Sequence, residues 1–255
     1  MSLLEKVRNL NSFVQNSKAI KFPDIAAVLS ELLKATIYIV DVDGTLRGRA
    51  YAEEFKCEER KEKNFISKHF RKDFLEYLNG ITSAEINIEI SIEECFIENY
   101  GKCLYKAKKS SVFPIYAYGD RAGTLICSRR TRRFNDEDTV VGECGVAIAA
   151  FEFMHCRRNE DAAKDARREA VDMAFEILSF SEKKAIKSIF MELNEMEGML
   201  VASKIADRSS LTRSVIVNAL RKFETAGIIE TQSLGMKGTY IKVKNEFLYE
   251  GLAAR

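Results

Sequence analysis

The side chains best able to do chemistry gather between residues 202 and 244. This segment holds eight basic and three acidic residues, a net charge of +5, whereas the rest of the chain carries −3. Within it, Thr212, Arg213, Ser214 and Asn218 supply hydroxyl, guanidinium and amide groups, which hydrogen-bond to base edges and phosphates. A basic segment on a nearly neutral chain is typical of a surface that binds nucleic acid, although a solvated basic face has the same composition.

Two short helices are predicted to position these side chains. Residues 202–208 form the first, with Ile205 and Ala206 facing inward, and residues 209–211 form a tight turn. Thr212 then caps a longer helix that runs to Ala226 and is ended by Gly227. The stripe expected to be buried is Val215, Ala219, Leu220 and Phe223. The residues expected off that stripe are Arg213, Ser214, Ile216, Val217, Asn218, Arg221 and Lys222.

A β-hairpin is predicted after the second helix, with strands at 228–229 and 240–243 and a glycine-hinged loop at 233–238. Helix, turn, helix and hairpin is the order of a winged helix-turn-helix, whose second helix fits the major groove of B-DNA. A small helical domain that binds protein through the same surface is the alternative. The expected DNA contacts are Ser203, Thr212, Arg213, Ser214, Asn218, Arg221, Lys222, Lys237 and Lys242.

The upstream part of the chain mixes helices with antiparallel hairpins, which predicts an α+β domain with one sheet. The Asp43-Gly44 and Gly119-Asp120 pairs are hairpin turn signals. Apolar periodicity predicts helices at 3–14, 25–32 and 53–79, and strands at 36–40, from 45, at 87–90, at 112–118 and at 124–128.

A long helix is predicted from the N-cap Asn135 to about Leu178. It carries an apolar stripe of Val140, Cys144, Ala147, Phe151 and Met154. Residues 157–169 are polar all round, which is typical of a helix that bridges domains. Ser181 is expected to cap the next helix, residues 182–193. The predicted organisation is therefore a sensor domain at 1–134, a connecting helix at 135–178 and a winged helix-turn-helix at 179–255.

Three C-terminal segments carry a family resemblance: Val201–Arg208 (VASKIADR), Thr212–Lys222 (TRSVIVNALRK) and Ser233–Val243 (SLGMKGTYIKV). Together with SLLEKVRNLN at 2–11 and FNDED at 134–138, they resemble the CodY family of bacterial regulators. The resemblance is near-continuous at the C-terminus and patchy between residues 15 and 130. It implies a GAF sensor domain, a homodimer, and repression of nutrient-responsive genes at A/T-rich inverted repeats. It also implies control by branched-chain amino acids and, in many members, by GTP.

The resemblance suggests where an amino acid would bind. The family grips the ligand carboxylate with an arginine and places a phenylalanine ten residues later, and Arg60 and Phe70 keep that spacing. A guanidinium suits a carboxylate bidentately, although a solvated helix charge explains Arg60 equally well. Phe74 would add a further wall. The family's Thr-x-Phe-Pro wall reads Cys95-Phe96-Ile97-Glu98 here, so the ligand can differ.

For GTP, the family's turn reads Ser-Arg-Arg-Gly, whereas this chain has Asp41-Val42-Asp43-Gly44. Carboxylates repel a polyphosphate. Glu152 and Arg157 match family nucleotide contacts on the long helix. No phosphate-binding P-loop motif occurs in the chain. The candidate nucleotide-binding residues are therefore Asp41, Asp43, Glu152 and Arg157, of which Asp41 and Asp43 lie in the turn where the family has two arginines.

An enzyme is the alternative function. Residues 37–46 resemble the first motif of haloacid-dehalogenase-type phosphatases, in which Asp41 would attack phosphorus and Asp43 would act as general acid beside Mg²⁺. That chemistry needs a parallel sheet and a later acidic motif. Asp43-Gly44 between two short β runs instead favours a hairpin.

Metal and membrane sites are not predicted. The six cysteines form no C-x-x-C pair and only two histidines exist, which favours reduced thiols over a zinc site, His155-Cys156 included. The chain has no run of 18 apolar residues and no signal peptide. We therefore expect a cytoplasmic, non-enzymatic regulator without cofactor or metal, whose partners are duplex DNA, a small-molecule effector and a second copy of the chain.

Overall fold

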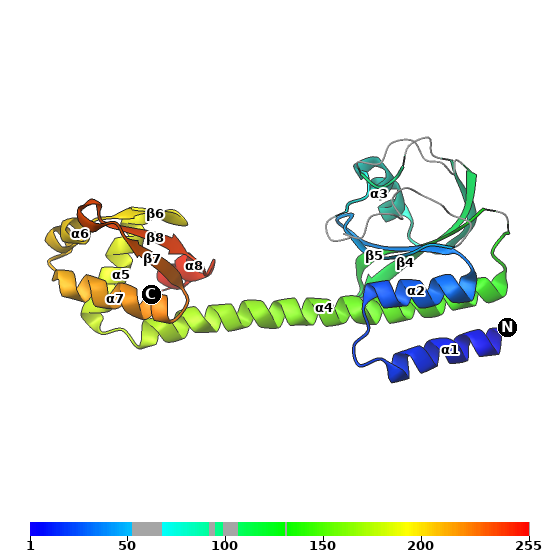
Figure 1. The fold of residues 1–255 in the computed structure, drawn as a ribbon, viewed down its shortest axis with the longest axis horizontal. Helices are drawn as coiled ribbons and strands as arrows, with labels where there is room; N and C mark the ends of the chain where they lie inside the picture. Colours follow the sequence, from blue (N-terminus) through cyan, green and yellow to red (C-terminus); the bar gives the residue numbers. More distant parts are fainter. Residues whose placement is uncertain (53–67, 92–94, 99–106, 131, 255) are drawn as a thin grey trace. The chain divides into compact units, whose positions relative to one another are not determined.

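The computed structural model describes residues 1–52, 68–91, 95–98, 107–130 and 132–254. It divides into two compact units, Met1–Arg157 and Arg158–Arg255. The division falls within α4 (Asp136–Glu176), in the polar stretch at 157–169 (Figure 1). The predicted limits at 134 and 178 instead follow the ends of this helix.

The first unit is built on a five-stranded antiparallel sheet with the strand order β2-β1-β5-β4-β3. Two hairpins, β1–β2 and β4–β5, supply four of the strands, as the turn signals predicted. The strands are β1 (Thr36–Asp41), β2 (Leu46–Ala50), β3 (Glu85–Ser91), β4 (Ala107–Ala117) and β5 (Asp120–Arg129).

Strand β1 is buried on both faces, because successive side chains in a strand point to opposite sides. Ile37 and Ile39 enter the core formed with α1 (Leu3–Asn16), α2 (Phe22–Leu33) and α4, whereas Tyr38 and Val40 enter a second core with α3 (Lys72–Gly80). Figure 1 shows α2 and α4 below the sheet and α3 above it. The helix α4 approaches α2 closely, since a Cβ on Gly145 would lie 2.6 Å from the Leu29 side chain.

The helix predicted at 53–79 begins later than expected. Residues 53–67 lie outside the described part of the chain, and α3 starts at Lys72. For residues 68–71 the prediction is wrong, because His69 pairs with Thr45 and Phe70 with Ile97 in isolated β-bridges. The backbone of residues 69 and 70 therefore forms bridges to other segments instead of the helix that the spacing of the phenylalanines predicted.

A buried ion pair joins the sheet to the start of α4. The Arg129 guanidinium lies 2.7 Å from the Asp138 carboxylate, and the two residues are 2% and 1% exposed. Asp138 also accepts a hydrogen bond from Lys6 at 3.3 Å, and its backbone N–H donates to the N-cap Asn135. Arg129 further donates to the Leu33 carbonyl at the end of α2. Elements α1, α2, β5 and α4 therefore meet at one polar junction.

The second unit contains the C-terminal end of α4, four further helices and a three-stranded antiparallel sheet with the order β6-β8-β7. Strand β6 was missed by the sequence analysis, because four residues carry too little periodicity. The helices are α5 (Phe180–Leu193), α6 (Ala202–Ser209), α7 (Arg213–Thr225) and α8 (Leu248–Ala253). The strands are β6 (Glu197–Leu200), β7 (Ile229–Ser233) and β8 (Thr239–Val243), with a 3₁₀ turn, η2 (Gly235–Lys237), between the last two.

The cap of α5 differs from the prediction. Ser179, and not Ser181, is the N-cap, and it forms a reciprocal capping box with Glu182. The glutamate three residues after Ser179 was the signal for this position. Ser181 lies within the first turn of the helix instead.

Helix α4 is long and apolar enough to cross a membrane by length and composition. The sequence has no uninterrupted run of 18 apolar residues, so no membrane span was predicted. Its most apolar 18-residue window has a mean hydropathy of 1.3. The core helix of a soluble protein passes the same test, so one such helix is weak evidence for a membrane span. Of that window 28% is buried, and Val141 and Ala149 of α4 lie in the core of the first unit.

The junction at Asp138 is expected to be a main source of stability in the first unit. Replacing Asp138 with Ala leaves the buried Arg129 charge uncompensated, so the free energy of unfolding should fall by about 3–5 kcal/mol. The control is Asp136→Ala in the exposed first turn of α4, which should cost under about 1 kcal/mol. Calorimetric unfolding of the full chain measures both. Equal effects of the two substitutions would contradict the role of the junction.

Candidate nucleic-acid interface and sensor sites

One face of α7 is anchored in the core of the second unit. Ile216, Ala219, Leu220 and Phe223 are buried there, at the i, i+3, i+4 and i+7 spacing of a helix face. The prediction that Ile216 lies off the buried stripe is wrong, and Val215 is only partly buried at its border. The 3.6-residue period aligns Ile216 with Ala219, Leu220 and Phe223 better than it aligns Val215.

The opposite face of α7 is polar and exposed. Arg213, Ser214, Asn218 and Arg221 are all exposed along it. The turn before α7 is made by Ser210 in a left-handed conformation with φ 56°. Thr212 occupies the N-cap position but forms no hydrogen bond to the helix backbone, so it caps α7 by position alone. Its hydroxyl lies 3.0 Å from that of Ser214.

Lys222 is the exception among the predicted contacts on α7. Its ammonium lies 2.7 Å from the Glu182 carboxylate and also donates to the Ile177 carbonyl at 3.2 Å. Although burial favours the neutral acid, the hydrogen bonds from Lys222 and Ser179 hold the pKa of Glu182 below its usual range. Lys222 therefore links α7 to α5 and to the residue that follows α4.

The hairpin between β7 and β8 forms the wing. Gly238 has φ 113°, and a Cβ there would lie 2.4 Å from the Leu200 carbonyl oxygen, so only glycine fits. Lys237 is exposed at the tip. Lys242 is exposed on β8 but is paired in register with Glu230 and Glu197 on the two neighbouring strands, which weakens its positive field.

Ser203, a further predicted DNA contact, belongs to α6, and its side chain is not among those that the structure describes.

The predicted effector residues converge on the α3 side of the sheet. The Phe96 ring centroid lies 4.9 Å from that of Phe70 and 5.2 Å from that of Phe74. Ile97 is buried in the same cluster, and Cys95 packs against it. Arg60 lies outside the described residues. The buried Lys108, which the sequence analysis missed, places its ammonium 4.9 Å from the Phe96 ring centroid.

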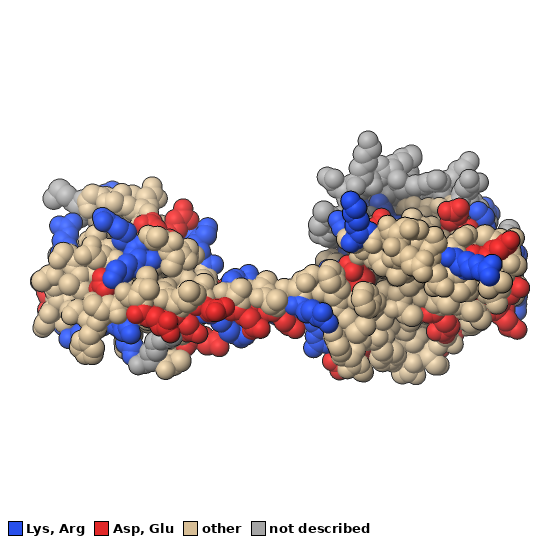
Figure 2. Space-filling view, turned by 90° about the horizontal axis from the view of Figure 1, so that it is seen from below, with Lys and Arg blue, Asp and Glu red and all other residues tan. Residues whose placement is uncertain are grey.

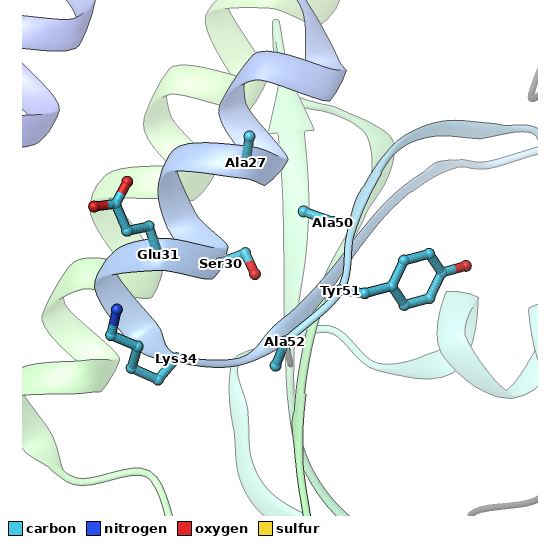
Figure 3. A pocket seen from close by; sticks show the side chains of 7 residues that line it. All are labelled: Ala27, Ser30, Glu31, Lys34, Ala50, Tyr51 and Ala52. Atoms are coloured by element: carbon cyan, nitrogen blue, oxygen red, sulfur yellow. The ribbon is translucent and has the colours of Figure 1, made fainter. Parts of the chain in front are cut away.

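A separate pocket of about 580 Å³ lies between α2 and the edge strand β2 (Figure 3). Its walls are the small side chains of Ala27, Ser30, Ala50 and Ala52, with Glu31, Lys34 and Tyr51 also lining it. None of the predicted effector residues lines it. Tyr51, which lines the pocket, also packs against the phenylalanine cluster, so the two features adjoin each other.

In the turn between β1 and β2, the carboxylates of Asp41 and Asp43 accept hydrogen bonds from neighbouring residues. The Thr45 backbone N–H donates to both Asp41 and Asp43, at 2.9 and 2.7 Å, and the Arg47 guanidinium lies 2.6 Å from Asp41. Burial and the hydrogen bond with Asp43 raise the pKa of Asp41 to about 6. The same hydrogen bond lowers the pKa of Asp43, which therefore carries a negative charge near the protein surface.

The two other candidate nucleotide residues lie on α4. Glu152 is buried, and its carboxylate lies 3.4 Å from His155 Nδ1 and 3.5 Å from the Cys156 sulfur. Arg157 forms an exposed ion pair with Asp120 at 3.4 Å. The neighbouring acid reduces the positive charge that Arg157 can offer to a phosphate.

The β1–β2 hairpin also differs from the parallel sheet that a phosphatase of this type requires. Strand β1, which ends at Asp41, pairs antiparallel with both β2 and β5. The haloacid-dehalogenase motif needs a parallel sheet with intervening helices, so the predicted hairpin is confirmed and the phosphatase geometry is not found. Among the described residues, no group of three or more His, Cys, Asp or Glu side chains could hold a metal ion, and Cys127 and Cys144 are free thiols.

Two family sequence models match the chain along most of its length. The CodY GAF-like domain matches residues 2–177, and the CodY helix-turn-helix domain matches residues 196–254. The chain belongs to the CodY family. The predicted family and the fold class, a GAF-like sensor with a long helix and a C-terminal helix-turn-helix, are confirmed.

Curated CodY relatives are similar over nearly their whole length. The global transcriptional regulator CodY of Clostridium perfringens (strain 13 / Type A) is 43% identical over 253 residues, covering 98% of each chain. CodY of Staphylococcus haemolyticus (strain JCSC1435) is 43% identical over 249 residues, covering 96% of each chain. The solved cofactor-binding GAF domain of the nutrient sensor CodY from Clostridium difficile is 21% identical, with a TM-score of 0.40, covering 60% of this chain and 99% of that one. The chain is therefore a CodY-family transcriptional regulator.

Proposed function

We propose that this CodY-family chain represses nutrient-responsive genes in the cytoplasm by binding A/T-rich inverted repeats in duplex DNA as a homodimer. The observation that carries the proposal is the polar face of α7, held outward by a buried apolar stripe. The major groove admits one α-helix, so this face can reach base edges while the wing reaches the flanking backbone.

The cations of this surface differ in their freedom to bind DNA. Arg213 and Arg221 are exposed and form no ion pair with the described residues. Lys237 at the wing tip is also exposed. Lys222 is engaged with Glu182, and Lys242 has glutamates on both neighbouring strands. We therefore assign base contacts to Arg213, Ser214 and Asn218, and backbone contacts to Arg221 and Lys237.

Substitutions at these positions are expected to separate two kinds of contact. Arg213→Ala or Asn218→Ala should weaken binding by about 1–3 kcal/mol and relax base preference, whereas Lys237→Ala should weaken binding to all sequences alike. Binding of the wild type should fall steeply with salt, because each neutralised phosphate releases counterions. Fluorescence anisotropy on specific and scrambled duplexes measures both. Equal loss on every duplex for all three variants would contradict the assignment.

The homodimer is proposed from the apolar stripe of α4. Val140, Ala147 and Phe151 are exposed, and Cys144 and Met154 are partly exposed, at alternating spacings of four and three residues. This is the heptad spacing by which one helix packs against a second copy of itself. The helical face of the first unit in Figure 2 presents a broad area without charged residues. Leu4 on α1 is exposed as well, as expected if the N-terminal helix contributes.

A charge placed in this stripe is expected to separate the copies. Phe151 is 63% exposed, so Phe151→Glu should leave the fold intact and lower dimer affinity at least tenfold, with a parallel loss of binding to inverted repeats. Phe180→Glu, at another exposed phenylalanine, is the control and should remain dimeric. Analytical ultracentrifugation measures the association. A Phe151→Glu variant as dimeric as the wild type would exclude this interface.

The effector is proposed to be a branched-chain amino acid, isoleucine or a relative, held against the cluster of Cys95, Phe96, Ile97, Phe70 and Phe74. The support is the convergence of these apolar side chains on one face of the sheet. Phe96 lies in contact distance of both other rings, so an apolar ligand needs this side chain to move. GTP is not expected at the β1–β2 turn, where Asp43 is ionised and Arg47 is paired with Asp41.

Calorimetric titration of the full chain tests both effectors. We expect heat with isoleucine, a loss of at least tenfold in affinity for Arg60→Ala, and retained binding for Phe96→Ala, because truncating Phe96 makes room. GTP at physiological salt should give no heat. The amino-acid proposal is overturned if no apolar amino acid binds. The expected repulsion at the β1–β2 turn is overturned if GTP binds the wild type and Asp43→Asn does not strengthen that binding.

A further inference from the structure

The polar face of α7 contains one apolar side chain. Val217 is 39% exposed and is flanked on the same helix by Arg213, Ser214, Asn218 and Arg221. Ser214 lies three residues before it and Arg221 four residues after it, so these side chains are its neighbours on the helix surface. Val217 takes no part in the buried core of the second unit, which α7 joins through the opposite face.

This valine does not extend an apolar docking surface along α7. The other large apolar side chains exposed in the described part of the second unit belong to α4, α5 and the segments that follow them, to β6 and to the wing. A single apolar group within a polar face suits a contact the size of one methyl group, and a surface for protein docking needs a larger contiguous patch.

The chemistry of the major groove supplies one such group. Every base pair presents hydrogen-bonding atoms there, and only thymine adds an apolar one, its C5 methyl. A valine has neither donor nor acceptor, so facing the amino group of cytosine it would desolvate that group without replacing its hydrogen bond. At this position valine therefore favours thymine and disfavours cytosine.

We propose that Val217 is a specificity-determining residue that reads the C5 methyl group of one thymine in each half-site. The proposal rests on the proposed function, because it needs α7 to lie in the major groove. Arg213, Ser214 and Asn218 would hydrogen-bond to the adjacent base pairs, and Val217 would fix the identity of the pair between them by packing. The class of ligand is duplex DNA with thymine at one fixed, symmetry-related position.

The test is a double-mutant cycle between the side chain and the methyl group. A duplex selected in vitro by the wild-type protein is resynthesised with each thymine replaced singly by deoxyuridine, which lacks only the C5 methyl. At one position per half-site, the wild type should lose about fourfold in affinity, the effect of one buried methyl group. Val217→Ala should lose a similar amount on the thymine duplex and be insensitive to deoxyuridine at that position. Fluorescence anisotropy measures all four combinations.

Controls keep the outcomes distinct. Met191 is 81% exposed on α5, and Met191→Ala should keep the wild-type response to deoxyuridine. Alanine is a better helix former than valine, so circular dichroism should show Val217→Ala fully folded. If Val217→Ala and the wild type respond equally to deoxyuridine at every position, or if neither responds, the proposal is wrong while DNA binding stands. If the wild type selects no duplex even in dilute buffer, both the proposed DNA-binding function and the role of Val217 are wrong.

Discussion

The burial of one face of α7 is the constraint on which the DNA-binding account depends. Ile216, Ala219 and Phe223 are fully buried, so rotating the helix about its axis would expose apolar surface and bury the polar face opposite. Burying an unpaired guanidinium costs far more than a hydrogen bond returns. The core therefore dictates that Arg213 and Asn218 face outward.

The second unit also shows how the end of the connecting helix reaches α7. Glu182 caps α5 through Ser179 and holds Lys222 of α7, while Lys222 donates to the carbonyl of Ile177, the residue after α4. Three helices share this one network. A displacement of the end of α4 would therefore act directly on the position of α7.

In Figure 2 the exposed middle of α4 carries alternating acidic and basic side chains, which suits a helix surrounded by solvent.

Strong local signals made much of the architecture predictable. Asp43-Gly44 and Gly119-Asp120 specify hairpins through backbone conformation, and Asn135 caps the long helix, so these features needed no knowledge of tertiary contacts. The features that were missed arise from contacts distant in sequence. The ion pair of Arg129 with Asp138 and the stacking of Lys108 on Phe96 leave no mark on periodicity. Lys222 was predicted to contact DNA, and its pairing with Glu182, forty residues earlier in the chain, has no local signal.

The central claim is that α7 enters the major groove with its polar face toward the bases. Photocrosslinking tests it most directly, with p-benzoylphenylalanine introduced singly at position 218 on that face and at position 224 near the other end of the helix. The account predicts that position 218 crosslinks to bases within the half-site of a specific duplex and that position 224 does not. A variant at 218 that still binds the duplex but crosslinks to no base would contradict it.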